Sequence, residues 1–141
     1  VCNEAERARR VAELLALVGL AGTESRMPSE LSGGMRKRVA LARTLALEPE
    51  VLLYDEPTTG LDPVTGRQIN MLIRDLQRRF GLTSIVVTHD LASAYYVADR
   101  IAFLADGRIR KISTVREMSG SEDPEIRTFL TAGALEAGGQ A

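Results

Sequence analysis

Two adjacent carboxylates, Asp55 and Glu56, close a short apolar run that begins at residue 51. The run is too short for a helix and is typical of a strand buried on both faces, so we expect the two acids at its carboxyl end. An aspartate there can hold Mg²⁺, directly or through water. A neighbouring glutamate can orient or deprotonate an attacking water. The alternative is that both acids only cap the strand or shape the following turn.

Ser32, Gly33 and Gly34 come shortly before this strand, directly ahead of a basic, helix-forming run at residues 35–38. A serine hydroxyl, flexible backbone N–H groups and the positive end of a helix macrodipole can together bind an anion. An anion site and metal-binding acids in one short interval indicate phosphate chemistry. The alternative is an ordinary flexible helix start, because an isolated Ser-Gly-Gly sequence is common.

Two residues further along the chain, His89 and Asp62, are also candidates for this site. His89 is the only histidine of the chain, and we expect it at the end of the next buried strand. Parallel packing of the two strands would bring it to the same crevice, where it could donate a hydrogen bond to a terminal phosphate oxygen; a purely structural histidine is the alternative. Asp62, which precedes Pro63, is typical of a helix N-cap and can serve a site as well.

Hydrophobic spacing, caps and turn residues predict the elements that must position these side chains. Asn3 and Glu6 predict a capping box, and Asp106-Gly107 predicts the turn of a β-hairpin. Residues 133–141 are small and polar, and we expect them to be disordered. Helices are expected over residues 3–18, 35–47, 63–80, 90–98 and 123–130, and strands over residues 51–55, 84–88, 101–104 and 108–112.

The strand, helix and strand between residues 51 and 88 have the spacing of a βαβ unit. Such a crossover forces parallel pairing and is right-handed in nearly all cases. The sequence therefore predicts an α/β fold with a parallel sheet, in which a metal-phosphate site lies beyond the carboxyl ends of the strands.

Composition narrows the class of protein. The 141 residues are 45% hydrophobic, which is enough for a core, and one domain or a large part of one is expected. Eighteen basic and nineteen acidic residues give a net charge of -1, so the overall balance offers no signature of nucleic-acid binding. No apolar run approaches the ~20 residues that cross a bilayer.

Four ordered motifs closely resemble the nucleotide-binding domain of ABC-type ATPases. They are residues 31–35 (Leu-Ser-Gly-Gly-Met), 52–58 (Leu-Leu-Tyr-Asp-Glu-Pro-Thr), 60–63 (Gly-Leu-Asp-Pro) and 87–90 (Val-Thr-His-Asp). The resemblance extends over residues 8–112 and implies a P-loop NTPase-like parallel sheet core, part of the ABC α-helical subdomain and a C-terminal β-hairpin.

The resemblance also implies roles for individual residues, with ATP and Mg²⁺ as cofactors. Asp55 matches the Walker B aspartate, which binds the metal, and Glu56 matches the catalytic glutamate. Asp62 lies in the stretch that matches the D-loop, and His89 matches the switch histidine. Residues 31–35 match the signature motif, with Met35 where glutamine is commonest in the family.

Domains of this family dimerise head to tail, so that the signature of one closes over ATP held by the other. Ser32, Gly33 and Gly34 would therefore touch the γ-phosphate of ATP on a second ATPase subunit. Asp55, Glu56 and His89 would serve the nucleotide bound to their own chain.

The main departure from the family pattern is that no G-x-x-x-x-G-K-[ST] phosphate loop occurs in the sequence. With a start at Val1, this indicates the C-terminal part of such a domain, or a degenerate one. We expect residues 1–47 to form part of the helical subdomain with the signature, 48–118 the C-terminal part of the ATPase core, and 119–141 a helix and flexible tail. These residues alone are expected neither to bind ATP tightly nor to hydrolyse it.

Met35, the basic residues after it and the segment at residues 121–130 resemble ATPases of MCE-associated (Mla-like) phospholipid transport systems. That resemblance implies a peripheral subunit at the cytoplasmic face of the inner membrane. Its partners would be membrane permease subunits and an MCE-domain lipid-binding protein, with phospholipid as cargo. The alternatives are the ATPase of an importer for a small solute such as an amino acid or a metal complex, a soluble ABC ATPase, and a non-hydrolysing binding module.

Overall fold

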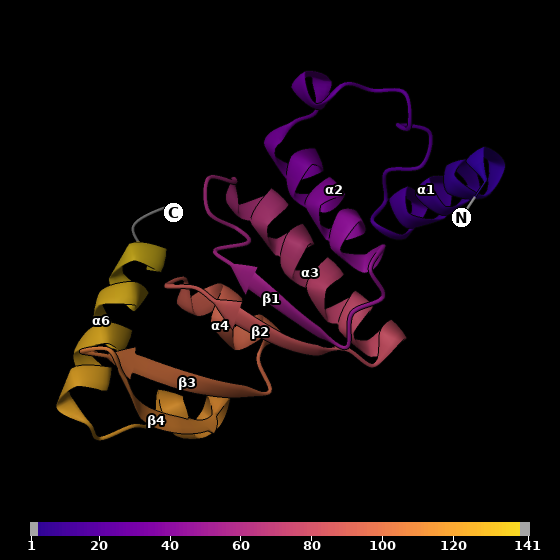
Figure 1. The fold of residues 1–141 in the computed structure, drawn as a ribbon. Helices are drawn as coiled ribbons and strands as arrows, with labels where there is room; N and C mark the ends of the chain where they lie inside the picture. Colours follow the sequence, from indigo (N-terminus) through magenta and orange to yellow (C-terminus); the bar gives the residue numbers. More distant parts are fainter. Residues whose placement is uncertain (1–2, 139–141) are drawn as a thin grey trace. The chain divides into compact units, whose positions relative to one another are not determined.

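The computed structural model describes residues 3–138, and the chain divides into two compact units, Val1–Ile85 and Val86–Ala141. Strand β2 (Thr83–Val87) crosses the boundary between them. The first unit contains α1 (Glu4–Leu17), the 3₁₀ turn η1 (Pro28–Glu30), α2 (Gly33–Leu45), β1 (Val51–Asp55) and α3 (Pro63–Phe80), as Figure 1 shows. The second unit contains α4 (Leu91–Val97), β3 (Arg100–Ala105), β4 (Arg108–Thr114), α5 (Val115–Ser119) and α6 (Pro124–Gly138).

Helix α1 starts with the predicted capping box. The Glu6 N–H donates to the side-chain oxygen of Asn3 at 2.8 Å, and the Asn3 N–H donates to the Glu6 carboxylate at 3.0 Å. These two bonds satisfy donors that a helix start otherwise leaves without a partner. Leu14 and Leu15 are buried, and α1 packs against α2.

The βαβ unit predicted from the sequence is present as β1, α3 and β2. The two strands pair in one sheet and run in the same direction in Figure 1. Asp62 caps α3, with its carboxylate accepting the N–H of Val64 and of Thr65 at 3.0 Å each. The helix ends at Gly81, whose φ of 64° is the left-handed conformation that glycine adopts at low cost.

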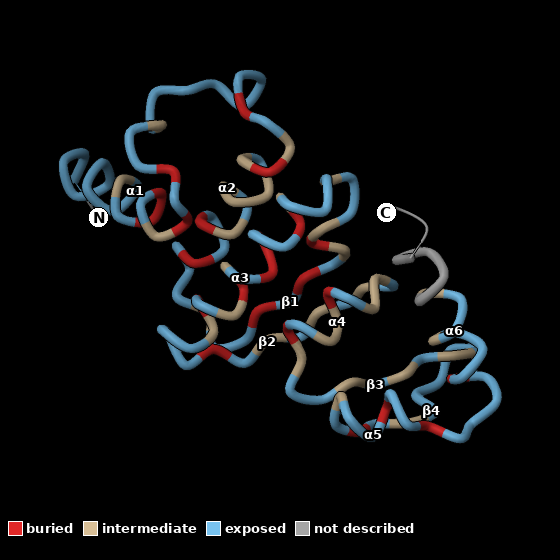
Figure 2. Tube along the Cα trace, turned by 180° about the vertical axis from the view of Figure 1, so that it is seen from behind, coloured by how far each residue is buried: buried red, intermediate tan, exposed pale blue. Residues whose placement is uncertain are grey.

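The core of the first unit lies between α3 and its neighbours. Ile69, Ile73 and Leu76 of α3 are at most 2% exposed, and Leu52 and Tyr54 of β1 are also buried. Buried residues along α2, α3 and β1 are drawn red in Figure 2. Helix α2 packs on the same helix α3.

The expectation that the strands are buried on both faces is wrong. Side chains along β1 alternate between exposed and buried, and Leu53 is 75% exposed whereas Leu52 is 3% exposed. On β2, Ile85 and Val87 are also more than half exposed. An apolar run of this length shows that both faces tolerate apolar side chains, but it does not determine which face another element covers.

Smaller differences concern where the elements begin and end. Helix α2 begins at Gly33 instead of Met35, because Ser32 supplies the cap and the glycines form the first turn. It ends at Leu45, before residue 47, and Glu48 has a left-handed φ of 50°. The sequence pattern does not predict helix α5, which is five residues long and begins with a capping box between Thr114 and Glu117.

The second unit contains the predicted hairpin of β3 and β4. Asp106 and Gly107 form its turn with φ values of 48° and 70°, as a two-residue type I′ turn requires. The rings of Phe103 on β3 and Phe129 on α6 meet edge to face at 5.5 Å. Helix α6 continues to Gly138, so the expectation of disorder from residue 133 is wrong for residues 133–138, while residues 139–141 lie outside the described part.

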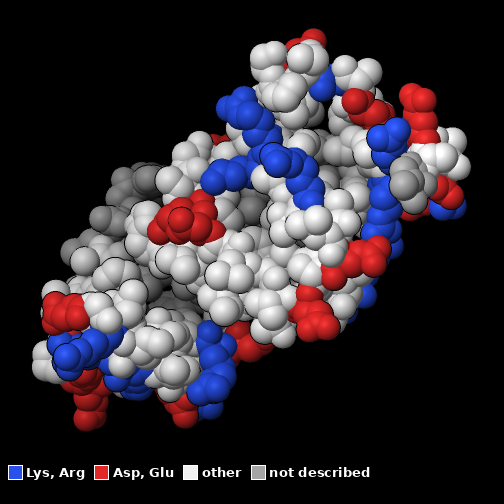
Figure 3. All heavy atoms as spheres, viewed as in Figure 1, with Lys and Arg blue, Asp and Glu red and all other residues white. Residues whose placement is uncertain are grey.

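Charged side chains of both signs are interspersed over the face seen in Figure 3, and an uncharged surface lies where β1 is drawn in Figure 1. The ion pairs between Arg9 and Glu13 and between Arg110 and Asp106 are exposed, and such pairs contribute little to stability. Among the helices of residues 3–138, we find none with the length and hydrophobicity that crossing a membrane requires.

Candidate functional site

The turn after β1 carries the two predicted acids. Asp55 is the exposed last residue of the strand, and Glu56 follows it with a φ of 44°. A left-handed backbone costs a residue with a side chain about 1–2 kcal/mol, so the surrounding contacts must hold Glu56 in place. Tyr54, which precedes Asp55 on the strand, is buried. Burial raises the pKa of its hydroxyl above the ordinary 10.0. That hydroxyl therefore remains neutral at physiological pH.

Contacts from Thr59 and Lys37 help to hold Glu56 in place. The Thr59 hydroxyl donates to the Glu56 carboxylate at 3.0 Å, and the Thr59 N–H donates to the Glu56 carbonyl at 3.3 Å. The ammonium group of Lys37, from helix α2, donates to the same carbonyl at 3.1 Å. The direction of the glutamate is therefore set both by its own turn and by a neighbouring helix.

Ser32, Gly33, Gly34 and Met35 form the start of α2. The Ser32 hydroxyl oxygen accepts the N–H of Met35 at 3.2 Å, and the Ser32 carbonyl accepts the N–H of Arg36 at 2.9 Å. The first N–H groups of an α-helix have no acceptor within the helix, which applies here to Gly33 and Gly34. Ser32 is exposed, and the arrangement can receive an anion at the positive end of the helix dipole.

The start of α2 packs directly on the first turn of α3 and on the segment before it. A Cβ atom on Gly34 would lie 2.6 Å from the methyl carbon of Thr65, and a Cβ on Gly33 would lie 3.4 Å from Leu61 Cδ2. Glycine at residue 34 is therefore required by close approach. The structure therefore brings the Ser-Gly-Gly helix start next to the segment containing Asp62.

Asp62 caps α3, as the sequence predicts. Hydrogen bonds from the Thr65 side chain and backbone, followed by the one from the Val64 N–H, lower the pKa of the Asp62 carboxyl from its ordinary 3.8. The side chain is therefore ionised at neutral pH and satisfies the helix N-terminus. This explains its sequence position without a ligand, and a second role in a site stays a prediction.

His89 belongs to the second unit, in the turn between β2 and α4. Its side chain is exposed. The next residue, Asp90, caps α4, and the Asp90 N–H donates to the Thr88 hydroxyl oxygen at 3.1 Å. The other candidate residues all belong to the first unit, at the start of α2, in the turn after β1 and in the segment at Asp62.

The donor set fits a metal only in combination with phosphate oxygens. Within the described residues, no group of three or more histidine, cysteine or acidic side chains could hold an ion without other ligands. Mg²⁺ is commonly bound by one or two carboxylates together with the phosphates of a nucleotide. Asp55, exposed at the carboxyl end of β1, suits that mode of binding.

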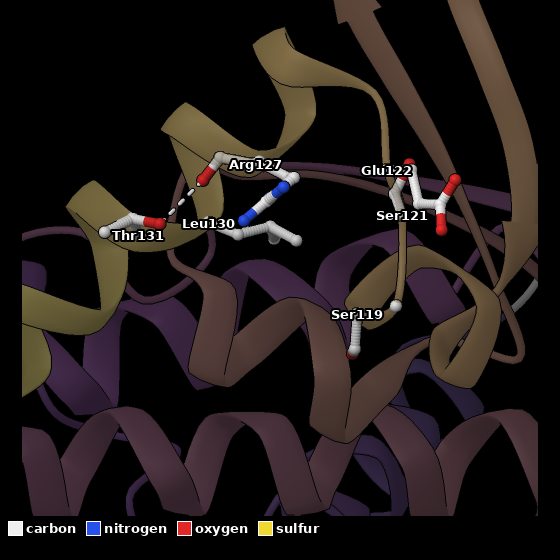
Figure 4. Close-up of a pocket in the computed structure, with 7 residues that line it drawn as sticks. Ser119, Ser121, Glu122, Arg127, Leu130 and Thr131 are labelled. Carbon is white, nitrogen blue, oxygen red and sulfur yellow. Dashed lines mark hydrogen bonds between the residues drawn. The ribbon is translucent and has the colours of Figure 1, made fainter.

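A separate hollow lies in the second unit, between the end of α5 and helix α6. It has a volume of about 340 Å³, and Figure 4 shows its lining residues, including Glu122 and Arg127. The Thr131 hydroxyl donates to the Arg127 carbonyl at 2.8 Å. None of the predicted site residues lines this hollow, and a carboxylate and a guanidinium on its wall give it no preference for an anion.

Sequence reasoning missed Lys37 and Thr59 as neighbours of Glu56. Lys37 lies between Arg36 and Arg38 in an unbroken basic run, and nothing in the sequence distinguishes the three. The sequence did contain a signal for Thr59. A threonine three residues after a glutamate can hydrogen bond back to it within one turn.

Comparison with known proteins finds a family match for the first part of the chain. Residues 2–59 match the family described as ABC transporter. The chain is 48% identical over 130 residues to the sulfate/thiosulfate import ATP-binding protein CysA of Xanthomonas campestris, covering 92% of this chain and 38% of that protein.

Two further relatives are named for the import of other substrates. The Fe(3+) ions import ATP-binding protein FbpC of Rhizobium etli is 50% identical over 113 residues, which cover 80% of this chain and 32% of the relative. The methionine import ATP-binding protein MetN 3 of Pectobacterium atrosepticum is 46% identical over 128 residues, which cover 90% of this chain and 37% of the relative. The chain thus spans well under half the length of each, and these import ATPases give no support to the expected phospholipid-transport subfamily.

The fold agrees with the sequence matches. The dimeric ATP-binding cassette MJ0796, in a post-hydrolysis state with ADP and Pi, superposes with a TM-score of 0.70 and 38% identity. The alignment covers 82% of this chain and 50% of that one. The predicted α/β fold is confirmed. The chain is therefore similar to ATP-binding proteins of ABC transporters, and it has the α/β fold of ABC cassettes.

Proposed function

We propose that the protein is the ATP-hydrolysing subunit of an ABC importer for a small solute. The relatives support this reading, because proteins named for sulfate, iron and methionine import match this chain at 46–50% identity. In this role it acts peripherally at the cytoplasmic face of the plasma membrane and binds permease subunits. Because the solute passes through the permease, the cargo does not contact this chain.

The observation that carries the proposal is the construction of the turn after β1. Asp55 and Glu56 lie at the carboxyl end of a parallel strand, and contacts from Thr59 and Lys37 fix the second acid in a left-handed conformation. Strained backbone that its surroundings fix in place concentrates at functional sites. A turn that served only to end the strand would not need this support.

In the proposed reaction Glu56 accepts a proton from the water that attacks the γ-phosphorus of ATP. The bond from the γ-phosphorus to the bridging oxygen breaks, and ADP and phosphate leave. Asp55 would hold Mg²⁺, which neutralises charge on the phosphates. His89 would donate a hydrogen bond to a terminal phosphate oxygen, and Asp62 would keep the segment between the acids and α3 in place.

The start of α2 serves the ATP of a second subunit in this proposal. Because the Ser32 oxygen accepts the Met35 N–H, the hydroxyl proton can be donated to a γ-phosphate oxygen. The N–H groups of Gly33 and Gly34 would donate alongside it. The dimeric state of the similar cassette supports pairing with a second subunit.

The experiment is ATP hydrolysis by the protein expressed from its whole gene. Glu56→Gln keeps the shape of the side chain but removes its basicity, so we expect the turnover rate to fall by about 10²–10⁴-fold. Binding of ATP, measured by calorimetry at a saturating magnesium concentration, should persist. Hydrolysis at the wild-type rate in Glu56→Gln would refute the assignment.

Cargo class needs its own test. Uptake of radiolabelled sulfate, iron and methionine by cells with and without the gene distinguishes small-solute import from other roles. Loss of one of these uptake activities, restored by the wild-type gene but not by the Glu56→Gln gene, is expected. Normal uptake of small solutes together with a defect in phospholipid movement between membranes would overturn the importer proposal.

A further inference from the structure

Three consecutive basic side chains on α2 each donate to a different backbone carbonyl. Arg36 donates to Leu31 at 2.5 Å, within its own helix start. Arg38 donates to Val18, after the end of α1, at 3.0 Å. Lys37 is the one whose acceptor is the carbonyl of Glu56. The three side chains of this basic cluster therefore hydrogen bond to three different parts of the chain.

The carbonyl that Lys37 reaches belongs to the strained residue of the turn. With φ at 44°, Glu56 lies in a conformation that a residue with a side chain adopts at a cost. The Thr59 N–H also donates to this carbonyl, at 3.3 Å, which is beyond the usual N–H···O range. The bond from Lys37 at 3.1 Å is shorter, it comes from a charged donor, and it is partly buried.

We propose that Lys37 is a positioning residue for the proposed general base, holding the Glu56 backbone in its left-handed conformation so that the carboxylate stays aimed at the attacking water. This inference rests on the proposed ATP hydrolysis by Glu56. It adds that the helix which begins with Ser32, Gly33 and Gly34 also fixes the catalytic turn of the same chain. Displacement of α2 would therefore be transmitted to Glu56 through one side chain.

Lysine suits this task by its shape. Its stem extends from the helix surface to the turn. Its ammonium group can donate to a single carbonyl oxygen, whereas the planar guanidinium of arginine is suited to paired acceptors. Methionine at this position keeps most of the stem but cannot donate. Arginine keeps a charged donor, with a different geometry, and so provides a conservative rescue.

The experiment compares Lys37→Met, Lys37→Arg and a matched control, Arg38→Met, in the protein expressed from its whole gene. The control removes a bond of the same kind from the adjacent residue, but its acceptors are Val18 and the side chain of Gln68, away from the turn. We expect Lys37→Met to lower kcat about tenfold with KM for ATP unchanged, because small misplacement of a catalytic group is costly. Lys37→Arg should recover most of kcat, and Arg38→Met should keep it.

A second measurement does not depend on hydrolysis. Hydrogen exchange of the peptide containing Glu56 and Thr59, measured without nucleotide, should accelerate in Lys37→Met and remain unchanged in Arg38→Met. Wild-type kcat and wild-type exchange in Lys37→Met would overturn the positioning role. An equal loss of kcat in Arg38→Met would also overturn it, because the effect would then be one of general stability.

The two proposals fail differently. Hydrolysis that Glu56→Gln leaves intact refutes the proposed function and, with it, the role of Lys37 in catalysis. Hydrolysis that requires Glu56 but does not change in Lys37→Met refutes the role of Lys37 alone.

Discussion

A single methyl group at residue 34 provides a sharp test of the packing between α2 and α3. In the structure, an added Cβ on Gly34 lies 2.6 Å from the methyl carbon of Thr65. Carbon atoms in contact normally lie about 3.5–4.0 Å apart, so Gly34→Ala requires a movement of about 1 Å. Gly34 is buried and Thr65 is β-branched, which restricts the ways in which either side can yield.

Two opposing effects set the magnitude. Overpacking a close contact of this kind costs about 1–3 kcal/mol. Alanine is favoured over glycine inside a helix by up to about 1 kcal/mol, and less in the first turn. We therefore expect Gly34→Ala to lower the free energy of unfolding by about 1–2 kcal/mol.

Gly33→Ala is the matched control, since it adds the same methyl group one residue earlier in the same helix turn. Its Cβ would meet Leu61 Cδ2 at 3.4 Å, the end of a flexible side chain that can move by a few tenths of an ångström. We expect a change in the free energy of unfolding within about 0.5 kcal/mol. Both variants are measured by urea unfolding of the protein expressed from its whole gene, with the midpoint as readout.

Thr65→Ser makes the test specific, because it deletes the methyl carbon that meets residue 34 and keeps the hydroxyl. The double variant Gly34→Ala with Thr65→Ser should recover most of the lost stability, which corresponds to a coupling of about 1 kcal/mol. If Gly34→Ala and Gly33→Ala destabilise equally, or if Thr65→Ser gives no rescue, the close approach of α2 to α3 is not the reason for glycine at residue 34.

Two further predictions concern α3. Leu76 is 0% exposed, so Leu76→Ala should lower the free energy of unfolding by about 2–5 kcal/mol. Met71, on the same helix, is 53% exposed, and Met71→Ala should change the free energy of unfolding by less than about 0.5 kcal/mol. Urea titrations measure both. Similar losses in the two variants would contradict the assigned core. The lowered pKa of Asp62 contributes stability that is fully present above its ordinary pKa of 3.8 and is lost as the pH falls through the lower folded-state pKa. Asp62→Asn cannot titrate at this residue, so it should be less stable than wild type at neutral pH. In unfolding curves recorded from pH 7 downward, the difference in free energy of unfolding between the two proteins should shrink below pH 3.8. A difference that stays constant would argue against this role of the Asp62 carboxylate.

The sequence is most informative where local chemistry decides the outcome. The capping box at Asn3, the cap at Asp62 and the left-handed end of α3 at Gly81 each depend on residues within a few positions of one another. The turn at Asp106-Gly107 is of the same kind. For the same reason, the position of the acids at the end of β1 follows from the amino-acid sequence alone.

What the sequence could not supply depends on packing between distant segments. It did not reveal which face of β1 is covered, because Leu52 and Leu53 are chemically alike and only their neighbours differ. It did not single out Lys37 from the basic residues beside it, because its acceptor lies nineteen residues away. The contact of Gly34 with Thr65 was hidden for the same reason.

The central claim is that Ser32 and Glu56 of one chain serve two different ATP molecules in a head-to-tail dimer. Mixed dimers of the protein expressed from its whole gene test it directly. The first pairs a Ser32→Arg subunit with a Glu56→Gln subunit, and the second pairs a subunit carrying both changes with a wild-type subunit. Each is purified through two different tags, and ATP hydrolysis is measured.

The proposed arrangement predicts that the first mixed dimer keeps one intact ATP site and hydrolyses ATP, whereas the second has no intact site and does not. If Ser32 and Glu56 of one chain served the same ATP, the first dimer would be inactive and the second would retain activity. That reversal would contradict the account.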